Sequence, residues 1–195
     1  MRIITISGKA RHGKDFTANA MADILRGAGK KVLITHYADL LKFICKNMFG
    51  WNGEKDEEGR HILQYVGTDV VRKQNPNFWV DYMIKVLKMF NNEWDYVIIP
   101  DTRFPNEIDR LGERFPYVYS VRVVRPDFDN GLSEEAQAHP SEHALDDYKF
   151  DYVIYNHGDS SFLEEIKRAL VNIVPSSMRH GIGTGFYDGY IQNNN

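Results

Sequence analysis

A glycine-bounded loop near the start of the chain carries residues suited to holding phosphate groups. Gly8, Gly13 and Lys14 fit the spacing G-x-x-x-x-G-K-[ST], in which backbone N–H groups surround phosphate oxygens and the lysine adds a positive charge. A helix that starts there would add the positive end of its dipole. Asp15 stands at the last place of the pattern, where a hydroxyl residue is usual. This spacing predicts a nucleotide phosphate-binding loop with a changed metal ligand.

At the last position of the pattern, the Asp15 carboxylate could bind Mg²⁺. The usual hydroxyl binds Mg²⁺, and Thr17 cannot replace it, because two positions along a helix turn a side chain to nearly the opposite face. A carboxylate is a hard oxygen ligand that suits Mg²⁺ directly or through a retained water. Asp101 is a second candidate ligand, since it follows the apolar run 96–100 in the manner of a Walker B acid. The alternative for Asp15 is that it only stabilises the helix N-terminus.

The chain around these residues alternates between strand-like and helix-like patterns. Apolar, β-branched runs predict strands at 2–7, 31–37, 96–100, 118–124 and 151–155. Periodic apolar residues predict helices from Asp15 to a glycine stop at 27–29, at 40–49, at 60–73 with a break at Gly67 and a new cap at Thr68, around 79–90, and at 162–173. This alternation predicts an α/β fold with a mainly parallel five-stranded sheet and helices on both faces. Ligands then bind beyond the carboxyl ends of the strands.

Composition excludes several classes of protein. The 195 residues, 43% hydrophobic and 26% charged, predict one globular domain, and no apolar run is long enough to span a membrane. The net charge of −3 argues against extended nucleic-acid binding. The single Cys45 cannot form an internal disulfide and is expected in the core. Without a recognisable export leader we expect a cytoplasmic protein, in the host cytoplasm if it is viral.

Four motifs carry a resemblance to a known family. They are the Gly-Lys-Asp end of the loop, the insert pattern R-x-x-x-Q-x-x-G-T-D-x-x-R at 60–72, DTRFPNE at 101–107 and HPSE at 139–142. Together they resemble the deoxynucleoside monophosphate kinases of tailed bacteriophages, over roughly residues 3–173. The Gly-Lys-Asp variant is also similar to animal phosphomevalonate kinase.

The resemblance implies a P-loop NTPase fold and a phosphoryl transfer. It implies one kinase domain over 1–174, with a monophosphate-binding helical insert at about 38–90, a lid at about 126–147 and a tail at 175–195 outside it. The implied reaction moves the γ-phosphoryl group of ATP to a deoxynucleoside monophosphate with Mg²⁺ as cofactor. The implied partners are these small molecules, with no nucleic acid and no membrane, and a homodimer stays open.

The same resemblance, with the chemistry of the side chains, implies the site residues. Expected catalytic residues are Lys14, Asp15, Asp101 and Arg103, with Asp15 and Asp101 as metal ligands. Expected ATP-binding residues are Gly8, Lys9, Ala10, Arg11, His12, Gly13, Lys14, Asp15, Phe16 and Arg125. Expected acceptor-binding residues are Lys42, Arg60, Gln64, Thr68, Arg72, Trp79, Arg103 and Glu142.

Phosphoryl transfer depends on alignment and on neutralising negative charge, which is why arginines matter here. An arginine fork can hold two phosphate oxygens, although Arg60 and Arg72 could equally form a solvated helix face. Gln64 could hydrogen-bond a base, whereas Trp79 is more often a core residue than a base-stacking one.

The lid departs from the family pattern. Residues 127–148 contain seven acids and no Lys or Arg, so neutralising charge must come from Lys14, Mg²⁺, Arg103 and the strand-end pair Arg122 and Arg125. His139 and His143 are the only further cations there, and His139 could equally cap a turn. Glu142 could cap a helix or orient an arginine.

Two other functions fit part of the pattern. One is a P-loop kinase of another small phosphorylated metabolite, such as phosphomevalonate. The other is a nucleotide-binding switch protein without rapid turnover, against which the clustered arginines of the insert argue, since a switch needs no second phosphate site.

Overall fold

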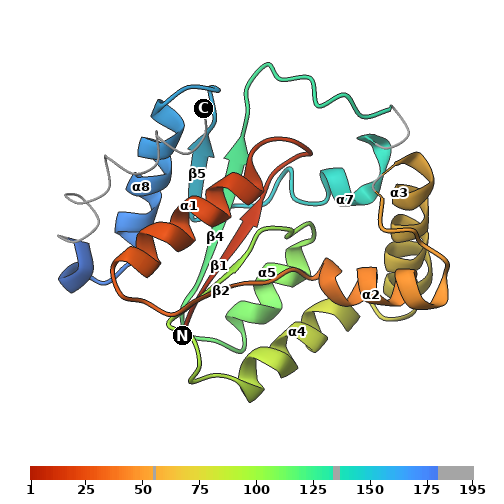
Figure 1. Ribbon diagram of the computed structural model, residues 1–195, viewed down its shortest axis with the longest axis horizontal. Helices are drawn as coiled ribbons and strands as arrows, with labels where there is room; N and C mark the ends of the chain where they lie inside the picture. The colour runs from red at the N-terminus through yellow and green to blue at the C-terminus, as the bar shows by residue number, and fades with distance from the viewer. Residues whose placement is uncertain (55, 134–136, 180–195) are drawn as a thin grey trace.

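Five short strands form one sheet in the computed structural model, which describes residues 1–54, 56–133 and 137–179. In this part of the chain the order is β2-β3-β1-β4-β5, and every neighbouring pair is parallel (Figure 1). The strands are β1 (Arg2–Ser7), β2 (Val32–Ile34), β3 (Tyr96–Ile99), β4 (Val118–Val124) and β5 (Tyr152–Tyr155). The expected parallel sheet is confirmed, although β2 is shorter than predicted because the chain turns at Tyr37, whose backbone N–H donates to Asp101.

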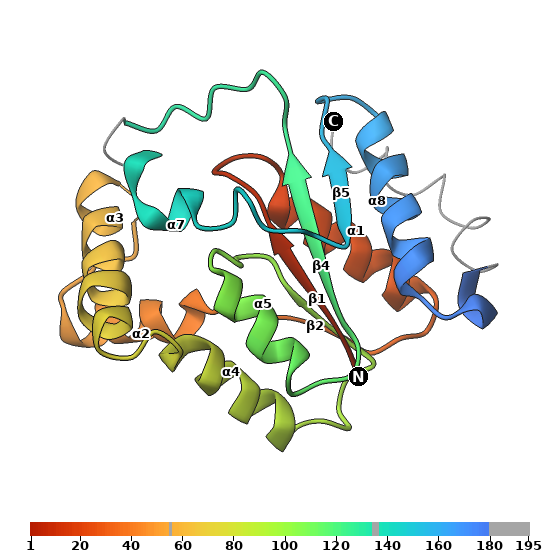
Figure 2. The same cartoon turned by 180° about the vertical axis from the view of Figure 1, so that it is seen from behind.

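Helices cover both faces of the sheet. They are α1 (Lys14–Gly27), α2 (Ala38–Met48), α3 (Glu57–Gln64), α4 (Phe78–Met89), α5 (Pro105–Gly112), α7 (Pro140–His143) and α8 (Ser161–Ile173), with a π-helix η1 (Tyr65–Arg72) and a 3₁₀ turn η2 (Ser176–Met178). Figures 1 and 2 show α1 and α8 on one face of the sheet and α4 and α5 on the other. Helices α2 and α3 lie beside the sheet, and both belong to the segment 38–90 that was expected as the insert.

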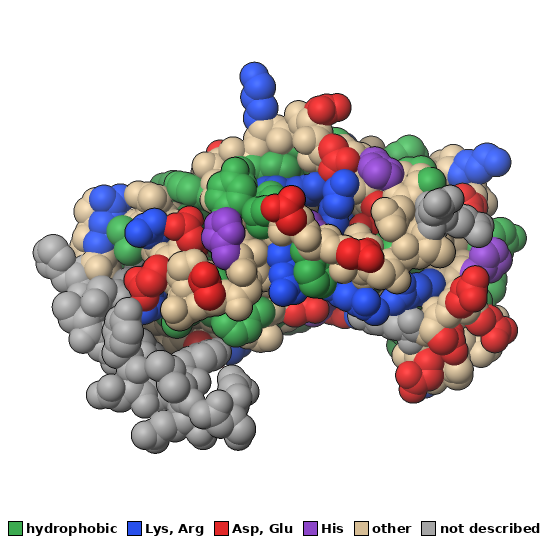
Figure 3. Space-filling view, turned by 90° about the horizontal axis from the view of Figure 1, so that it is seen from above, with side chains coloured by type: hydrophobic (Ala, Val, Ile, Leu, Met, Phe, Trp, Pro, Cys, Tyr) green, Lys and Arg blue, Asp and Glu red, His purple; other side chains and the backbone are tan. Residues whose placement is uncertain are grey.

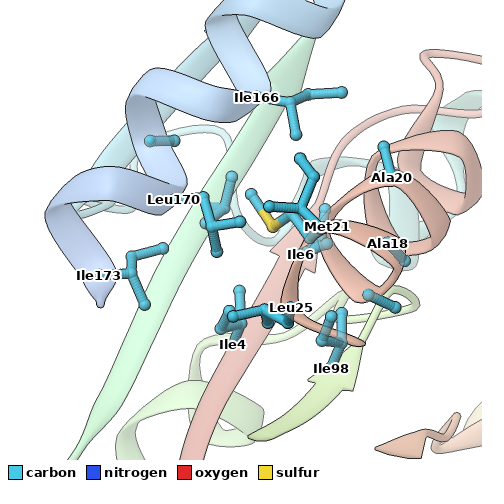
Figure 4. Close-up of a cluster of buried hydrophobic side chains, with 14 of the residues drawn as sticks. Ile4, Ile6, Ala18, Ala20, Met21, Leu25, Ile98, Ile166, Leu170 and Ile173 are labelled. Carbon is cyan, nitrogen blue, oxygen red and sulfur yellow. The ribbon is translucent and has the colours of Figure 1, made fainter. Parts of the chain in front are cut away.

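The core has two halves, one on each face of the sheet. Ile4 and Ile6 point into one half, where α1 and α8 bring Met21 and Leu170 against them (Figure 4). Ile3, which directly precedes Ile4, points to the opposite half with Trp79 and other residues of α4. Successive strand side chains face opposite ways, so a strand buried on both faces can carry apolar residues at consecutive positions, as Ile3 and Ile4 of β1 do.

The helix predicted at 60–73 begins earlier than expected and has no break. Helix α3 starts at Glu57, ahead of the predicted start at residue 60, where Asp56 caps it by accepting from the backbone N–H of Gly59 at 2.8 Å. The predicted break at Gly67 is wrong, because the helix continues through that glycine as a π-helix. Gly67 is packed so closely that an added Cβ would lie 2.8 Å from the Leu41 side chain. The glycine therefore serves helix packing.

Several smaller predictions have mixed outcomes. Cys45 is buried as expected, beside Trp51 and Val66. Phe16 and Phe90 were predicted on buried helix faces but are 44% and 45% exposed. Phe16 instead stacks on Phe162 at 5.4 Å between ring centroids, and Phe90 lies just beyond the end of α4.

Two further observations concern the chain as a whole. No helix in the described ranges combines the length and apolarity needed to cross a membrane. The tail residues Phe186, Tyr187 and Tyr190, for which the sequence leaves both a surface position and disorder open, lie outside the described residues, as do lid residues 134–136.

Candidate active site

The phosphate-binding loop joins β1 to α1 and needs glycine at both of its ends. Gly8 has φ +156°, and an added Cβ would lie 2.6 Å from the carbonyl oxygen of Val123 on β4. Gly13 has φ +103°, and an added Cβ would lie 2.9 Å from Nδ2 of Asn156. Larger residues would therefore meet both backbone strain and a close neighbour. The predicted glycine spacing has a structural cause at each position.

Lys14 is the first residue of α1, and its ammonium group is held inside the loop. Nζ donates to the backbone carbonyl of Lys9 at 2.8 Å. Burial lowers the pKa of Lys14 to about 8, and the positive charge of Arg103 adds to the effect. A buried ammonium with a lowered pKa is poorly compensated by protein groups, so an anion placed beside it would stabilise its charge.

Asp15 lies in the first turn of α1 with an exposed side chain. The N-cap of the helix is Gly13, which provides no side-chain cap, and no described residue donates a hydrogen bond to the Asp15 carboxylate. The carboxylate remains near the positive end of the helix dipole. Its oxygens are thus open toward the cavity that it lines together with Lys14 and Asp101.

Asp101 follows β3, which pairs directly with β1, so it lies at the strand end next to the one from which the loop leaves. Its carboxylate accepts hydrogen bonds from the backbone N–H groups of Tyr37 and Ala38, at 3.0 and 2.9 Å. Burial raises the pKa of Asp101, and these two hydrogen bonds oppose that rise. Asp101 therefore anchors the start of α2, a role that the sequence did not reveal.

The oxygen atoms of Asp15 and Asp101 decide whether the two acids fit a metal site. The described residues contain no group of three or more His, Cys, Asp or Glu placed to hold an ion. Mg²⁺ commonly uses only one or two carboxylates and completes its shell with water and substrate phosphates. Asp15 has free oxygens, and each Asp101 oxygen keeps a lone pair beyond its one backbone bond. The two acids fit this kind of site.

A cavity of about 460 Å³ lies at the carboxyl ends of the strands, between the loop, the insert and α7. Figure 3 looks onto this end of the molecule, where Lys and Arg side chains gather with acids beside them. The cavity brings together most of the predicted site residues, namely Ala10, Arg11, Lys14, Asp15, Lys42, Arg60, Gln64, Thr68, Arg72, Trp79, Asp101, Arg103 and Glu142. Its lining does not include the predicted residues Gly8, Lys9, His12, Gly13, Phe16 and Arg125.

The π-helix explains how one helical segment presents four predicted residues to this cavity. Arg60, Gln64, Thr68 and Arg72 recur every fourth residue, and all four line it. In an α-helix each step of four overshoots a full turn by about 40°. The wider turn of η1, with its i→i+5 bonds, reverses that drift. These four residues, called the polar stripe below, therefore stay on one side of the helix. The indole N–H of Trp79 donates to the Gly67 carbonyl of this helix at 3.0 Å.

Glu107 lines the cavity and binds two of its neighbouring residues, a role that the sequence did not predict. It is 1% exposed and receives the guanidinium of Arg72. Its other oxygen accepts from the backbone N–H groups of Arg103 and Phe104, at 2.7 and 3.1 Å. Arg72 also lies 4.1 Å over the Phe104 ring. Two signals were available, because Glu107 is the last residue of the DTRFPNE motif and stands three residues after Phe104, as in a capping box.

The lid residues contact the site through hydrogen bonds. Glu142 receives the guanidinium of Arg103, which also donates to the Ser141 carbonyl at 3.3 Å. Of the two roles considered for Glu142, the structure thus favours orienting an arginine. His139 caps α7, since its Nδ1 accepts from the backbone N–H of Ser141 at 3.2 Å.

His12 and Arg125, which were predicted to bind ATP, lie on the other side of the loop, toward β4 and β5. His12 is buried and its Nδ1 accepts from the backbone N–H of Arg125 at 3.1 Å, while burial lowers the His12 pKa. The Arg125 guanidinium lies 3.8 Å over the Phe128 ring. Asn156, missed by the sequence analysis, donates to the His12 carbonyl at 3.0 Å and so holds the loop from β5.

Comparisons with known proteins give consistent results. A family model described as deoxynucleotide monophosphate kinase matches residues 29–169. A putative deoxynucleotide monophosphate kinase of Acanthamoeba polyphaga mimivirus is 27% identical over 204 residues, covering 91% of this chain and 98% of the relative. The deoxynucleotide monophosphate kinase of Enterobacteria phage T4 is 32% identical over 115 residues, which are 58% of this chain and 44% of that protein.

Solved structures share the fold. A sugar kinase from Janibacter sp. HTCC2649 superimposes with a TM-score of 0.52 at 15% sequence identity, covering 90% of this chain and 97% of that one. At this identity the likeness shows a common α/β P-loop kinase architecture and nothing about substrates.

Proposed function

Because the chain belongs to the deoxynucleotide monophosphate kinase family, we propose that it transfers the γ-phosphoryl group of ATP to a deoxynucleoside monophosphate, giving ADP and the diphosphate. One observation supports this most strongly. A single cavity is lined by Lys14 and Asp15 of the loop, by Asp101 and Arg103 at the end of β3, and by the polar stripe of the insert. Two phosphate-binding groups of residues therefore face one space, as in-line transfer requires.

The loop is proposed to hold the donor. Its backbone N–H groups would surround the β-phosphate, and Lys14 would leave the Lys9 carbonyl to contact the terminal phosphates. Its buried environment favours this exchange, because an anion compensates the ammonium charge better than one neutral carbonyl does. Arg125 is proposed to contact ATP on the β4 side of the loop.

The insert and the end of β3 are proposed to hold the acceptor. Arg103, fixed by Glu142, and Arg72, fixed by Glu107, would present their remaining N–H groups to the acceptor phosphate. Arg60, Gln64, Thr68 and Lys42 line the same cavity and are proposed to contact the rest of the nucleotide. Trp79 would support this wall, since it is 3% exposed and its indole N–H is already bonded.

Asp15 and Asp101 would hold Mg²⁺, which when bound neutralises phosphate charge and orients the terminal phosphate. The carboxylate of Asp15 is the better placed of the two for a direct bond, because Asp101 already accepts two backbone N–H groups. Arg103 would then balance the charge that spreads over the transferred group.

The reaction is proposed to take place in the cytoplasm, that of the host if the chain is viral, where ATP and deoxynucleotides are both available. We propose no role for nucleic acid or membranes in the reaction. Every residue assigned above comes from one chain, so the site needs no second subunit, and a homodimer would leave it complete.

An acceptor screen tests this proposal. ADP release is measured with ATP, Mg²⁺ and each of dTMP, dGMP, dCMP, dAMP, hydroxymethyl-dCMP or phosphomevalonate. We expect ADP release that depends on at least one deoxynucleotide. Activity with phosphomevalonate alone would assign a different kinase, and ATP binding without any acceptor-dependent release would assign a switch protein.

A further inference from the structure

Asp146, just beyond α7, joins the lid segment to the base of the phosphate-binding loop. Its Oδ1 accepts from Nη2 of Arg122 at 2.9 Å, and its Oδ2 lies 3.5 Å from Nζ of Lys9. His143, one turn earlier, places Nδ1 3.1 Å from the same Oδ2. Asp146 and its two cationic partners all lie outside the lining of the acceptor cavity. They therefore form a separate cluster on the donor side of the loop.

The two cations held by Asp146 lie on either side of Gly8. Arg122, on β4, pairs in register with Ser7 and donates to its Oγ at 3.0 Å through Nη1. Lys9 follows Gly8, and its backbone carbonyl is the acceptor for the Lys14 ammonium. One carboxylate thus connects the residue before Gly8 with the residue after it. Gly8 itself has no side chain through which its position could be fixed.

We propose that Asp146 is a positioning residue for the donor site, acting through Arg122 and Lys9 to set the path of the loop around Gly8. This rests on the proposed function, because it assumes that the loop binds ATP. The same lid segment holds Arg103 through Glu142, four residues earlier. Residues 142–146 therefore contact an arginine of the acceptor cavity and two cations of the donor loop.

Partial burial of one partner separates this contact from an ordinary surface ion pair. The Arg122 side chain is 14% exposed, whereas the Lys9 and Asp146 side chains are 37% and 36% exposed. Asp146 itself and Lys9 lie at the surface, where an ion pair adds little to stability, so loss of Asp146 should leave the fold intact. Its effect should appear in the affinity for the donor, where misplacing the loop weakens several contacts at once.

The test is steady-state kinetics of Asp146→Asn, which keeps the size and removes the charge. We expect KM for ATP to rise about fivefold, with KM for the deoxynucleotide changed less than about twofold. Asp147→Asn is the matched control, because it removes the same charge from the adjacent exposed residue, and it should leave both KM values unchanged. Thermal unfolding of all proteins checks that the fold is retained.

A double-mutant cycle tests the route through Lys9. If Asp146 acts through Lys9, adding Asp146→Asn to a Lys9→Gln background should raise KM for ATP less than it does in the wild type. An unchanged or lower KM for ATP in the Asp146→Asn single variant would overturn the proposal, because an acid that merely repels the donor gives that result. Wild-type turnover in the same assay shows separately whether the proposed function holds.

Discussion

The guanidinium of Arg72 and the carboxylate of Glu107 form an ion pair that joins the π-helical part of the insert to the start of α5. Their side chains are 14% and 1% exposed. Glu107 also binds the backbone N–H groups of Arg103 and Phe104, so one buried acid fixes two arginines of the cavity. The side of the cavity that is proposed to bind the acceptor therefore depends on a residue that need not touch the substrate.

Glu107→Gln should destabilise the protein by about 3 kcal/mol, because it leaves a largely buried guanidinium without its counter-charge. Both oxygens of Glu107 accept hydrogen bonds, so the NH₂ group of the glutamine would face a donor, either Arg72 or the backbone N–H groups of Arg103 and Phe104. Urea unfolding followed by circular dichroism measures the loss. Glu113→Gln, at the exposed end of the same helix, is the control and should change stability by less than about 0.5 kcal/mol. Equal stability of the two variants would contradict this account of Glu107.

Lys14→Met should stabilise the ligand-free protein at pH 7 while abolishing turnover. The Lys14 pKa falls from 10.5 to about 8 on folding, a cost of about 3 kcal/mol below pH 8. Loss of the Lys9 hydrogen bond offsets about 1 kcal/mol of the gain. Between pH 8 and 10.5 the unfolded wild type holds more protons than the folded one, so wild-type stability rises with pH there.

The advantage of Lys14→Met over wild type should therefore shrink across that pH window. Above it the sign should reverse, because the neutral amine no longer carries a burial cost for charge and keeps its hydrogen bond to the Lys9 carbonyl. Thermal unfolding at a series of pH values from 7 to about 11 measures it. A variant less stable than wild type at pH 7 would show that the ammonium is well compensated in the folded protein.

Asp15→Asn should raise the Mg²⁺ concentration needed for half-maximal turnover by about tenfold, since an amide oxygen is a weaker ligand for this cation than a carboxylate. The change also removes the interaction of the charge with the helix dipole, which costs at most about 1 kcal/mol of stability and does not alter the Mg²⁺ response. Asp23→Asn removes the same charge further along α1 and serves as control. An unchanged Mg²⁺ response in Asp15→Asn would assign the carboxylate to the helix alone.

Gly13→Ala should cost about 2–3 kcal/mol of stability and abolish ATP binding, because strain at φ +103° is joined by a contact with Asn156. Gly29→Ala tests strain alone. Gly29 has φ +74°, and no atom lies within 4 Å of an added Cβ, so this change should cost about 1 kcal/mol and leave ATP binding intact. Similar losses in both variants would rule out crowding as the cause at Gly13.

The sheet and the position of the loop could be predicted from sequence because local patterns determine them. Apolar runs and glycine spacing mark β1, the loop and α1, and parallel topology then brings Asp101 beside them at the neighbouring strand end. Every-fourth-residue spacing already groups Arg60 with Gln64, and both line the cavity, while their binding of the acceptor stays a prediction.

Other parts of the site depend on contacts between residues far apart in sequence. Glu107 and Arg72 are 35 residues apart, Asp101 and Tyr37 are 64 apart, and Asn156 and His12 are 144 apart. No periodicity marks such pairs. The π-helix was missed for a related reason, because its glycine resembles a helix break until the packing of Gly67 against Leu41 is known.

Transfer of a labelled γ-phosphoryl group tests the central claim most directly. ATP carrying the label is incubated with Mg²⁺, the enzyme and the deoxynucleoside monophosphate that performs best in the acceptor screen, and the products are separated. We predict label in the β-phosphate of the deoxynucleoside diphosphate, and none with Lys14→Ala. Label found only in inorganic phosphate, or equal transfer by Lys14→Ala, would contradict the account.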